Sequence, residues 1–496
     1  MTRRSLRLAA LAGAVLALAL PPREWAWPAF LYAPLLLLAI EGASIRNAAL
    51  LGSFSGLVFL VPATWWVAHS ASRFGQVPTF VGVLAELLLL FVESLVPAVA
   101  AAFTVHVTRR GGRAHLALPA ALALGFAAMP MIMPWRPAFL VLPFVDFAQT
   151  LALGGAVLLD LLVMGVGTCA LEAARRRHRT LGALTLLLVL VPSALGHVHR
   201  LETSRARRSA PSVRLGLAQP NVPIAMGRDP RRNRERLDRM HALERALEAQ
   251  GAEVAVFPES TYPYPVRREV VRDVPPPHGV RAEGLGIPVV AGVLTDAGPC
   301  AKRNTILAVD AEGRFVGHAD KVRPFPFADT IPLWDALPFL HARFPCRGLA
   351  PAETPGVLAV AGAKLGSLVC YDSVEAWPSR ALVAKGAEIL VEHTNDAWYG
   401  DTGEPHMHSR VARMRSIETR RDVVRVTNTG LTEHVAATGE RLAALPMFEP
   451  ESRVVVVPRL EGLTPYARFG DGPAVFLAGL VALLALVRRR GPSDAA

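Results

Sequence analysis

Residues 365–372 have the sequence LGSLVCYD, a short apolar run that ends in a cysteine, a tyrosine and an aspartate. The run at 365–369 predicts a buried β-strand, because it is short and is followed at once by polar residues. Such a strand would carry Cys370 to its carboxyl edge, where backbone N–H groups can receive an oxyanion. Taken alone, a single cysteine is more often an inert core residue. A catalytic role for Cys370 therefore depends on partners elsewhere in the chain.

Strand and helix patterns alternate on both sides of this stretch. Alternation of this kind predicts an α/β or layered α+β domain. The predicted strands are 213–219, 254–258, 288–294, 305–309, 314–318, 365–370, 389–394, 423–427 and 453–457, and the predicted helices are 230–249, 375–385 and 404–421.

Two further polar residues stand where predicted strands end. Glu259 follows the run 254–257 after a proline, and Lys321 follows the strand-like stretch 314–318. Either residue alone would be interpreted as a solvated surface group, since Glu and Lys are mostly exposed. A carboxylate can take the proton of a thiol, and a neighbouring ammonium favours the thiolate. Together with Cys370, the two residues fit a nucleophilic site.

The flanks of this domain contain the longest apolar runs of the chain. Of the 496 residues, 52% are hydrophobic and only 19% are charged, which disfavours an ordinary cytosolic protein and excludes a disordered chain. The apolar runs predict a polytopic α-helical membrane bundle of about eight spans. The first run would also fit the core of a secretory signal, since arginines precede it. The candidate spans are 6–20, 25–40, 47–68, 77–107, 116–133, 150–171, 181–198 and 473–487.

Arginines gather in alternate loops between these spans. With eight spans, the basic groups at 3–7, 46, 109–113, 175–179 and 488–490 fall on one side, and only Arg23, Arg73 and Arg136 fall on the other. The positive-inside rule then places both termini in the cytoplasm and the intervening domain outside it. Part of the net charge of +12 therefore comes from arginines that orient the helices in the membrane, and no nucleic-acid partner is expected.

The predicted organisation has three parts. Residues 1–199 form transmembrane helices with about seven spans, residues 200–465 form an extracytoplasmic catalytic domain, and residues 466–496 form a final helix and a basic cytoplasmic tail. The charged residues 205–208 and the stretch 462–472 are expected to be linkers. Glu86, Glu93 and Asp160 fall inside spans, where they either line a polar cavity or pair with a neighbouring helix; we favour pairing.

Five short motifs follow one another along the chain: FPES at 257–260, KRNT at 302–305, Lys321 with Pro326 and Phe327, VCYD at 369–372, and TNDAWYG at 394–400. In this order they resemble the nitrilase (carbon-nitrogen hydrolase) superfamily. Two further runs, ARMRSIE at 412–418 and GLTPYAR at 462–468, together with the flanking helices, resemble the apolipoprotein N-acyltransferase family over nearly the full length. This resemblance implies an αββα nitrilase-like sandwich attached to the membrane bundle.

The same resemblance implies a ping-pong acyl transfer in the bacterial cytoplasmic (inner) membrane. Cys370 would be the nucleophile, Glu259 the general base and Lys321 the cation beside the oxyanion. The acyl donor would be a membrane phospholipid, typically phosphatidylethanolamine, and the acceptor the α-amino group of a diacylglyceryl-cysteine at an apolipoprotein N-terminus. No cofactor or metal is implied. The residues expected to bind substrate or support the triad are Asn304, Asp329, Tyr371, Asp372, Asn395 and Trp398.

Four positions depart from the family pattern. Asp329 and Asp372 stand where glutamate is usual, which withdraws each carboxylate by about one methylene. Pro220 replaces a glycine, and Arg228 replaces an aromatic residue. The triad is intact, so these departures bear on the identity of the acyl donor and acceptor.

The remaining cysteines and three histidines leave alternatives open. Cys169 lies in a span and is interpreted as packing, whereas Cys300 and Cys346 would lie in an oxidising compartment, where a disulfide can form. His393, His406 and His408 would suit a metal by residue type, but we favour satisfied polar or substrate-lining roles.

Two other classes of function compete with acyl transfer. A membrane-bound amidase or hydrolase of the same superfamily would use the same triad with water in place of the amine. A non-catalytic scaffold would have no need for Glu259, Lys321 and Cys370 together.

Overall fold

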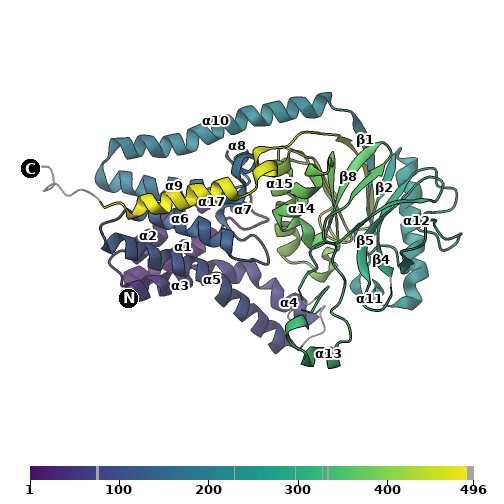
Figure 1. Ribbon diagram of the computed structural model, residues 1–496, viewed down its shortest axis with the longest axis horizontal. Helices are drawn as coiled ribbons and strands as arrows, with labels where there is room; N and C mark the ends of the chain where they lie inside the picture. Colours follow the sequence, from purple (N-terminus) through teal and green to yellow (C-terminus); the bar gives the residue numbers. More distant parts are fainter. Residues whose placement is uncertain (74–77, 228, 297, 327, 332–333, 489–496) are drawn as a thin grey trace, which may run out of the picture. The chain divides into compact units, whose positions relative to one another are not determined.

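Figure 1 shows the computed structural model of the protein, in which residues 1–73, 78–227, 229–296, 298–326, 328–331 and 334–488 are described. The chain divides into two compact units. Met1–Leu201 with Phe469–Ala496 form the first, called the helical unit, and Glu202–Arg468 form the second, called the sheet unit. Glu259, Lys321 and Cys370 all belong to the sheet unit.

The helical unit has a helix over each run that was predicted to span the membrane. Among the described residues, α3, α5, α9 and α10 are long and apolar enough to cross a bilayer, while α2, α6 and α17 are apolar but shorter. The number of about eight spans therefore stays a prediction. The helices are α1 (Arg3–Ala17), α2 (Pro28–Ile40), α3 (Ile45–Thr64), α4 (Trp66–Arg73), α5 (Thr79–Arg109), α6 (Ala114–Ala128), α7 (Pro137–Leu140), α8 (Val145–Ala148), α9 (Leu151–Arg176), α10 (Arg179–Ser209) and α17 (Gly472–Leu486).

Two glycines allow the apolar helices of this unit to approach closely. A Cβ at Gly52 of α3 would lie 2.2 Å from the carbonyl oxygen of Pro97 in α5, and one at Gly167 of α9 would lie 2.1 Å from that of Phe30 in α2. Since lipid tails are as apolar as leucine, helices in a bilayer associate through such close van der Waals packing. Small residues at these positions are therefore a packing requirement.

The ionisable residues within the apolar helices have polar partners. Asp160 of α9 is fully buried, 2.5 Å from Arg136 Nε, and it accepts a bond from the backbone N–H of Ala138 at 2.6 Å. Glu86 accepts a bond from Thr64 Oγ1 at 3.2 Å. Glu93 Oε1 accepts a bond from the backbone N–H of Ile132 at 3.4 Å. The pairing favoured from the sequence is thus observed between side chains for Asp160 and Glu86, whereas Glu93 pairs with a backbone group.

The sheet unit contains two sheets. Among the described residues, one sheet has the order β13-β1-β2-β4-β5-β6 with β3 beside β4, and the other has the order β12-β11-β10-β9-β8-β7. The first sheet comprises β1 (Ser212–Gln219), β2 (Val254–Val256), β3 (Val266–Arg267), β4 (Val289–Asp296), β5 (Arg303–Val309), β6 (Phe315–Asp320) and β13 (Glu451–Pro458). The second comprises β7 (Val357–Val360), β8 (Ala363–Val369), β9 (Ile389–Thr394), β10 (Val423–Thr427), β11 (Glu433–Val435) and β12 (Arg441–Ala444).

Helices cover the outer faces of the two sheets, as the sequence pattern predicts for a layered α+β domain (Figure 1). Valines, leucines and isoleucines of both sheets form one shared core, so the sheets pack face to face. Leu237 and Leu247 of α12 (Asn233–Ala249) pack against the first sheet. α14 (Ala376–Ala384) and α15 (Glu404–Thr419) pack against the second sheet through Leu382 and Ala412. The remaining short helices are α11 (Ile224–Gly227), α13 (Phe339–Arg343) and α16 (Pro465–Phe469).

The prediction that residues 205–208 form a linker was wrong. These residues are the last turns of α10, which continues to Ser209 because neither proline nor glycine occurs between Gly196 and Pro211. Arg207 donates to both carboxylate oxygens of the buried Asp422, at 2.7 and 2.8 Å. The run of arginines was misjudged because a bidentate pair with a residue 215 positions along the chain cannot be seen in local composition.

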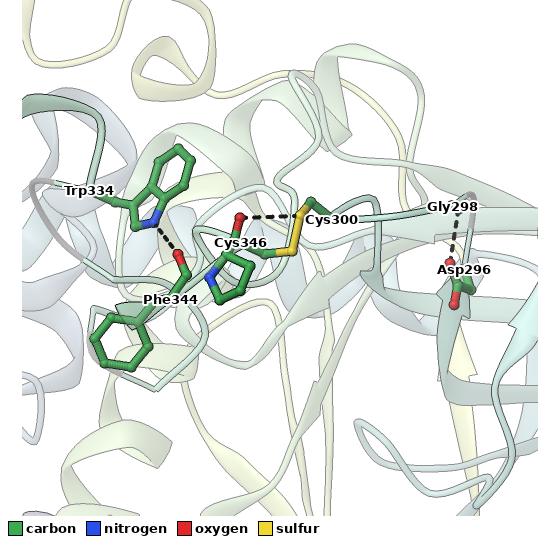
Figure 2. Close-up of a disulfide and its surroundings, with 7 residues drawn as sticks. Asp296, Gly298, Cys300, Trp334, Phe344 and Cys346 are labelled. Carbon is green, nitrogen blue, oxygen red and sulfur yellow. Dashed lines mark hydrogen bonds between the residues drawn. A yellow bond between two sulfur atoms is a disulfide. The ribbon is translucent and has the colours of Figure 1, made fainter. Parts of the chain in front are cut away.

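A disulfide joins Cys300, in the connection between β4 and β5, to Cys346, which follows α13. Their Cα atoms are 5.2 Å apart, within the usual range for a disulfide. Figure 2 shows the indole N–H of Trp334 donating to the carbonyl of Phe344 at 3.0 Å beside this bond. The bond closes a loop that contains Lys321 and Asp329. Cys169 is free and buried in α9, as interpreted.

Candidate active site

Glu259 is held in a buried turn after β2. The backbone N–H of Gly292 in β4 donates to the carbonyl of Pro258 at 3.1 Å, and a Cβ at Gly292 would lie 2.6 Å from the Cα of Glu259. Only glycine lets this turn lie so close to β4. The glutamate is 7% exposed, so it is not a solvated surface group.

Lys321, directly after β6, joins two carboxylates. Its Nζ lies 2.9 Å from Glu259 Oε1 and 2.7 Å from Asp329 Oδ2. The Asn304 side chain donates to the same Glu259 oxygen at 2.6 Å, and the Asn304 carbonyl accepts from the Lys321 backbone N–H at 2.9 Å. Burial alone would lower the pKa of Lys321, but the charges of Glu259 and Asp329 raise it well above its ordinary value. The ammonium is therefore permanently charged.

Cys370 stands at the carboxyl end of β8, as the first residue of a 3₁₀ turn (Cys370–Ser373). Its φ of 52° is in the left-handed region, which non-glycine residues rarely adopt. Residues held in such a conformation are concentrated at functional sites. Burial raises the pKa of the thiol well above its ordinary value, and the charge of Glu259 adds to this. Lys321 and a hydrogen bond with Thr394 act in the opposite direction. The resting sulfur is thus a thiol that needs a base.

Two family models match the chain. Residues 214–459 match the carbon-nitrogen hydrolase family, and residues 12–169 match the apolipoprotein N-acyltransferase N-terminal domain. The chain is 28% identical to the apolipoprotein N-acyltransferase of Geobacter metallireducens over 98% of this chain and 96% of that protein. It is 29% identical to that of Ralstonia nicotianae over 97% and 93%. The chain belongs to the apolipoprotein N-acyltransferase family.

Among solved structures, an amidase from Nesterenkonia sp. AN1 matches with a TM-score of 0.38 at 20% identity, over 54% of this chain and 99% of that chain. The apolipoprotein N-acyltransferase relatives match across both units of the chain. The family therefore accounts for the helical unit as well as the sheet unit.

Asp372 connects the Cys370 turn with the segment after Lys321. Its buried carboxylate accepts backbone N–H bonds from Val369 at 3.0 Å and from Arg323 at 2.7 Å. Burial raises its pKa to about 7, although Lys321 and these backbone donors lower it. Asp372 therefore supports the site by fixing two loops. Tyr371 places its ring edge-on against Phe325, with the centroids 4.9 Å apart, and reinforces the same connection.

The other expected supporting residues lie on the turn after β9. The Asn395 side chain accepts a bond from the backbone N–H of Ala397 at 3.3 Å and one from Asn428 Nδ2 at 3.0 Å. This pattern stabilises the turn rather than the ion pair of Lys321. Trp398 is partly exposed next to it. Arg228 and Phe327 lie outside the described residues.

Sequence reasoning missed a buried charged cluster behind Cys370. Its members are Glu392 of β9, Asp396 in the turn after β9, Glu404 and His408 of α15, and Arg425 of β10. The available signal was the presence of charged residues inside otherwise apolar strands, which is costly unless they are paired. Their partners come from separate elements, so the pairing could not be seen in the sequence.

Three members of this cluster have the spacing of a metal site. Ligand atoms of Asp396, Glu404 and His408 lie within 4.8 Å of one another. However, Arg425 Nη2 donates to Asp396 Oδ2 at 2.9 Å, and His408 Nε2 lies 2.9 Å from Glu392 Oε1. Burial would lower the pKa of His408, but Glu392 and Asp396 raise it to about 10. The described side chains of this cluster therefore pair with one another and with Arg425 as buried ion pairs.

The other two histidines differ from His408. His393 is buried, with Nδ1 2.7 Å from the carbonyl oxygen of Phe257, and burial lowers its pKa to about 4. It is therefore a neutral donor that joins β9 to the strand end before Glu259. Burial also lowers the pKa of His406.

Proposed function

We propose that the protein transfers an acyl chain from a membrane phospholipid, through a thioester on Cys370, to the α-amino group of an apolipoprotein's N-terminal diacylglyceryl-cysteine. Lipoprotein N-acylation follows from the family to which the chain belongs. The observation that carries the mechanism is the bridge of Lys321 between Glu259 and Asp329, beside the strand end that bears Cys370. The proposed catalytic residues are Glu259, Lys321 and Cys370.

In the first half-reaction, Glu259 takes the thiol proton and the sulfur attacks the ester carbonyl of the phospholipid. Lys321 and Asn304 both bond to Glu259 Oε1, so we assign the proton transfer to Oε2. The carbonyl electrons move to an oxyanion, which the ammonium of Lys321 stabilises. The oxyanion collapses, the C–O bond breaks, and Glu259 returns its proton to the leaving lysophospholipid alkoxide.

In the second half-reaction, the amine of the diacylglyceryl-cysteine attacks the thioester carbonyl. The C–N bond forms, the C–S bond breaks, and Glu259 transfers the proton lost by the amine to the departing sulfur. The products are an N-acylated lipoprotein and the free thiol of Cys370. A thioester suits this step because an amine displaces a thiolate far more readily than an alkoxide.

We further propose that the sheet unit works on the outer side of the bacterial cytoplasmic membrane. The arginine distribution supports this side by the positive-inside rule. The Cys300–Cys346 disulfide is independent support, since disulfides persist in oxidising compartments (Figure 2). On this proposal, residues 1–199 supply about seven spans, residues 200–465 the catalytic domain, and residues 466–496 the last span and a cytoplasmic tail.

The test uses purified full-length protein, phosphatidylethanolamine with a labelled acyl chain, and a synthetic diacylglyceryl-cysteine peptide. Intact-protein mass spectrometry is expected to show one added acyl chain before the peptide is supplied and its loss afterwards, with the peptide amine acylated. Cys370→Ser removes the label, whereas Cys169→Ser keeps it. Release of free fatty acid instead of acylated peptide would favour a hydrolase, and an unlabelled wild-type protein would refute acyl transfer.

A further inference from the structure

Ser373, three residues after Cys370, contacts the backbone of the cysteine and the buried charged cluster. Its Oγ lies 3.1 Å from the Cys370 carbonyl oxygen, 2.9 Å from Glu392 Oε1 and 3.1 Å from His408 Nε2. His408 Nε2 in turn lies 2.9 Å from Glu392 Oε1. One side of the imidazole is thus connected to the Cys370 main chain.

Thr394, the last residue of β9, connects the sulfur to the same cluster. Val369 and His393 are paired in the register of β8 and β9, so Thr394 lies beside Cys370 at the ends of these strands. A hydrogen bond from Thr394 is one of the causes that lower the pKa of the Cys370 thiol, and Thr394 Oγ1 donates to Asp396 Oδ1 at 3.3 Å. His408 Nδ1 lies 3.4 Å from that same aspartate oxygen. The other side of the imidazole is thus connected to the sulfur.

Both nitrogens of the His408 ring face carboxylates. Only a doubly protonated ring can donate to Glu392 on one side and to Asp396 on the other. The raised pKa of His408 agrees with this geometry. His408 is therefore a buried cation that joins the two connections.

The charged groups around His408 balance one another. The packed elements present Glu392 from β9, Asp396 from the following turn, Glu404 from α15 itself, and Arg425 from β10. Burial raises the pKa of Glu404, which favours its neutral form. Glu392 and Asp396 are then matched by Arg425 and His408. The more distant Glu433 is paired with Arg441 at 2.6 Å.

We propose that His408 is a positioning residue for Cys370. By donating a hydrogen bond to Asp396, His408 leaves the hydroxyl proton of Thr394 available to the sulfur. This inference rests on the proposed function, in which Cys370 is the nucleophile. The hydroxyl of Thr394 has a single proton and two acceptors, the thiolate and Asp396. The aspartate already receives bonds from Arg425 and His408, so the proton can turn to the sulfur when Glu259 removes the thiol proton.

Loss of the His408 charge would reverse this competition. Asp396 would retain the Thr394 proton, and the thiolate would lose a donor. Hydrogen bonds to the charged form favour that form, so the pKa of the thiol would rise. The connection through Ser373 would be lost at the same time, although it acts on the carbonyl and not on the sulfur.

The experiment measures the rate of Cys370 alkylation by iodoacetamide against pH, in full-length protein purified in detergent. The Cys169→Ala background leaves Cys370 as the only free thiol, since Cys300 and Cys346 are bonded to each other. His408→Gln is expected to move the midpoint of the profile upward by about one pH unit. Alkylation needs neither phospholipid nor acceptor, so a failure of acyl transfer would not disturb this result.

His434→Gln is the matched control. His434 is also a buried imidazole paired with a carboxylate, 2.7 Å from Asp422 Oδ2, but it lies on β11. Its loss is expected to leave the alkylation midpoint unchanged. An equal shift in His434→Gln, or no shift in His408→Gln, would overturn the proposal.

Thr394→Val keeps the proposal testable if His408→Gln does not fold. The valine has a similar shape and lacks the hydroxyl, so the midpoint is expected to rise by about one pH unit. Adding His408→Gln to Thr394→Val is expected to produce no further shift, because the shared proton is already gone. An unchanged midpoint in Thr394→Val, or fully additive shifts in the double variant, would contradict the assignment.

Discussion

The sheet unit buries two groups of charged side chains next to Cys370, and they differ in charge balance. Lys321 is one cation between two carboxylates, those of Glu259 and Asp329. The second group has two cations, His408 and Arg425, against two carboxylates that are ionised. The first group therefore has a carboxylate left to exchange a proton, whereas the second group is neutral as a whole. An unbalanced cluster suits proton transfer, and a balanced one suits positioning.

The largest effect is expected from Lys321→Met, which removes the only cation of the first group. Loss of a charge that stabilises an oxyanion costs on the order of 10³-fold in rate, so acyl transfer to the peptide should become undetectable. Membrane expression should be unchanged, because the side chains of Glu259 and Asp329 keep some exposure, 8% and 15%, whereas those of Glu392 and Asp396 in the second group have none. Lys385→Met is the matched control, since Lys385 directly follows α14 and its Nζ donates to the Pro355 carbonyl at 2.8 Å. Near-normal turnover in Lys321→Met would remove the assigned role.

The second group should fail in a different manner. Arg425→Met leaves Glu392 and Asp396 buried with one cation fewer, and an uncompensated buried charge costs about 3–5 kcal/mol. We expect a lower thermal midpoint and a lower yield of folded protein, measured by fluorescence-detected size exclusion. Arg413→Met on α15, whose Nε donates to the Gly439 carbonyl at 3.0 Å, should cost less. A fully stable but inactive Arg425→Met would place Arg425 with the first group instead.

Asp329→Asn tests whether the first group needs both carboxylates. Lys321 would keep Glu259 and lose one charge-assisted bond, so acyl transfer should fall about tenfold, equivalent to about 1.4 kcal/mol. Asp329→Glu, which restores the residue usual in the family, should retain most of the activity. Full activity in Asp329→Asn would show that Glu259 alone is sufficient to hold Lys321.

The two groups also differ in how far the sequence could predict them. Glu259, Lys321 and Cys370 each follow a predicted strand end within a motif, so their proximity could be inferred from the family resemblance. Arg425 and Glu392 are opposite one another only in the register of β9 and β10. His408 reaches them from α15. Nothing local specifies such pairings, because they depend on how three elements pack.

The same limit applies to the fold. The apolar periodicity predicted nearly every central strand and the long helices, because burial imposes that periodicity. It missed the edge strands β7 and β12 and the two-residue strand β3, which have few buried positions. It also missed β11, which is fully buried but has only three residues, two of them Glu433 and His434. It also took the charged end of α10 for a linker, because the carboxylate that pairs with Arg207 lies more than 200 residues away, at Asp422.

The smallest expected effect concerns Asp372, which belongs to neither group and connects the two loops of the site. Burial raises its pKa from 3.8 to about 7, so folding takes up a proton between these values. The protonated Asp372 carboxyl therefore contributes to the free energy of unfolding at acid pH, and this contribution is lost as the pH rises through 7. Asp372→Asn keeps an acceptor oxygen and does not titrate. Relative to the wild type, its thermal midpoint should gain about 2–4 °C between pH 5 and pH 8.

Asp422 supplies the control for this measurement, because its pKa is shifted in the opposite direction. Burial would raise the pKa of Asp422, but hydrogen bonds from His434 and Arg207 lower it below the ordinary value. Its stabilisation is complete above pH 5 and is lost only in more acid solution. The difference between Asp422→Asn and the wild type should therefore stay constant from pH 5 to pH 8. A constant difference for Asp372→Asn as well would mean that Asp372 stays ionised in the folded protein, and that its backbone donors outweigh its burial.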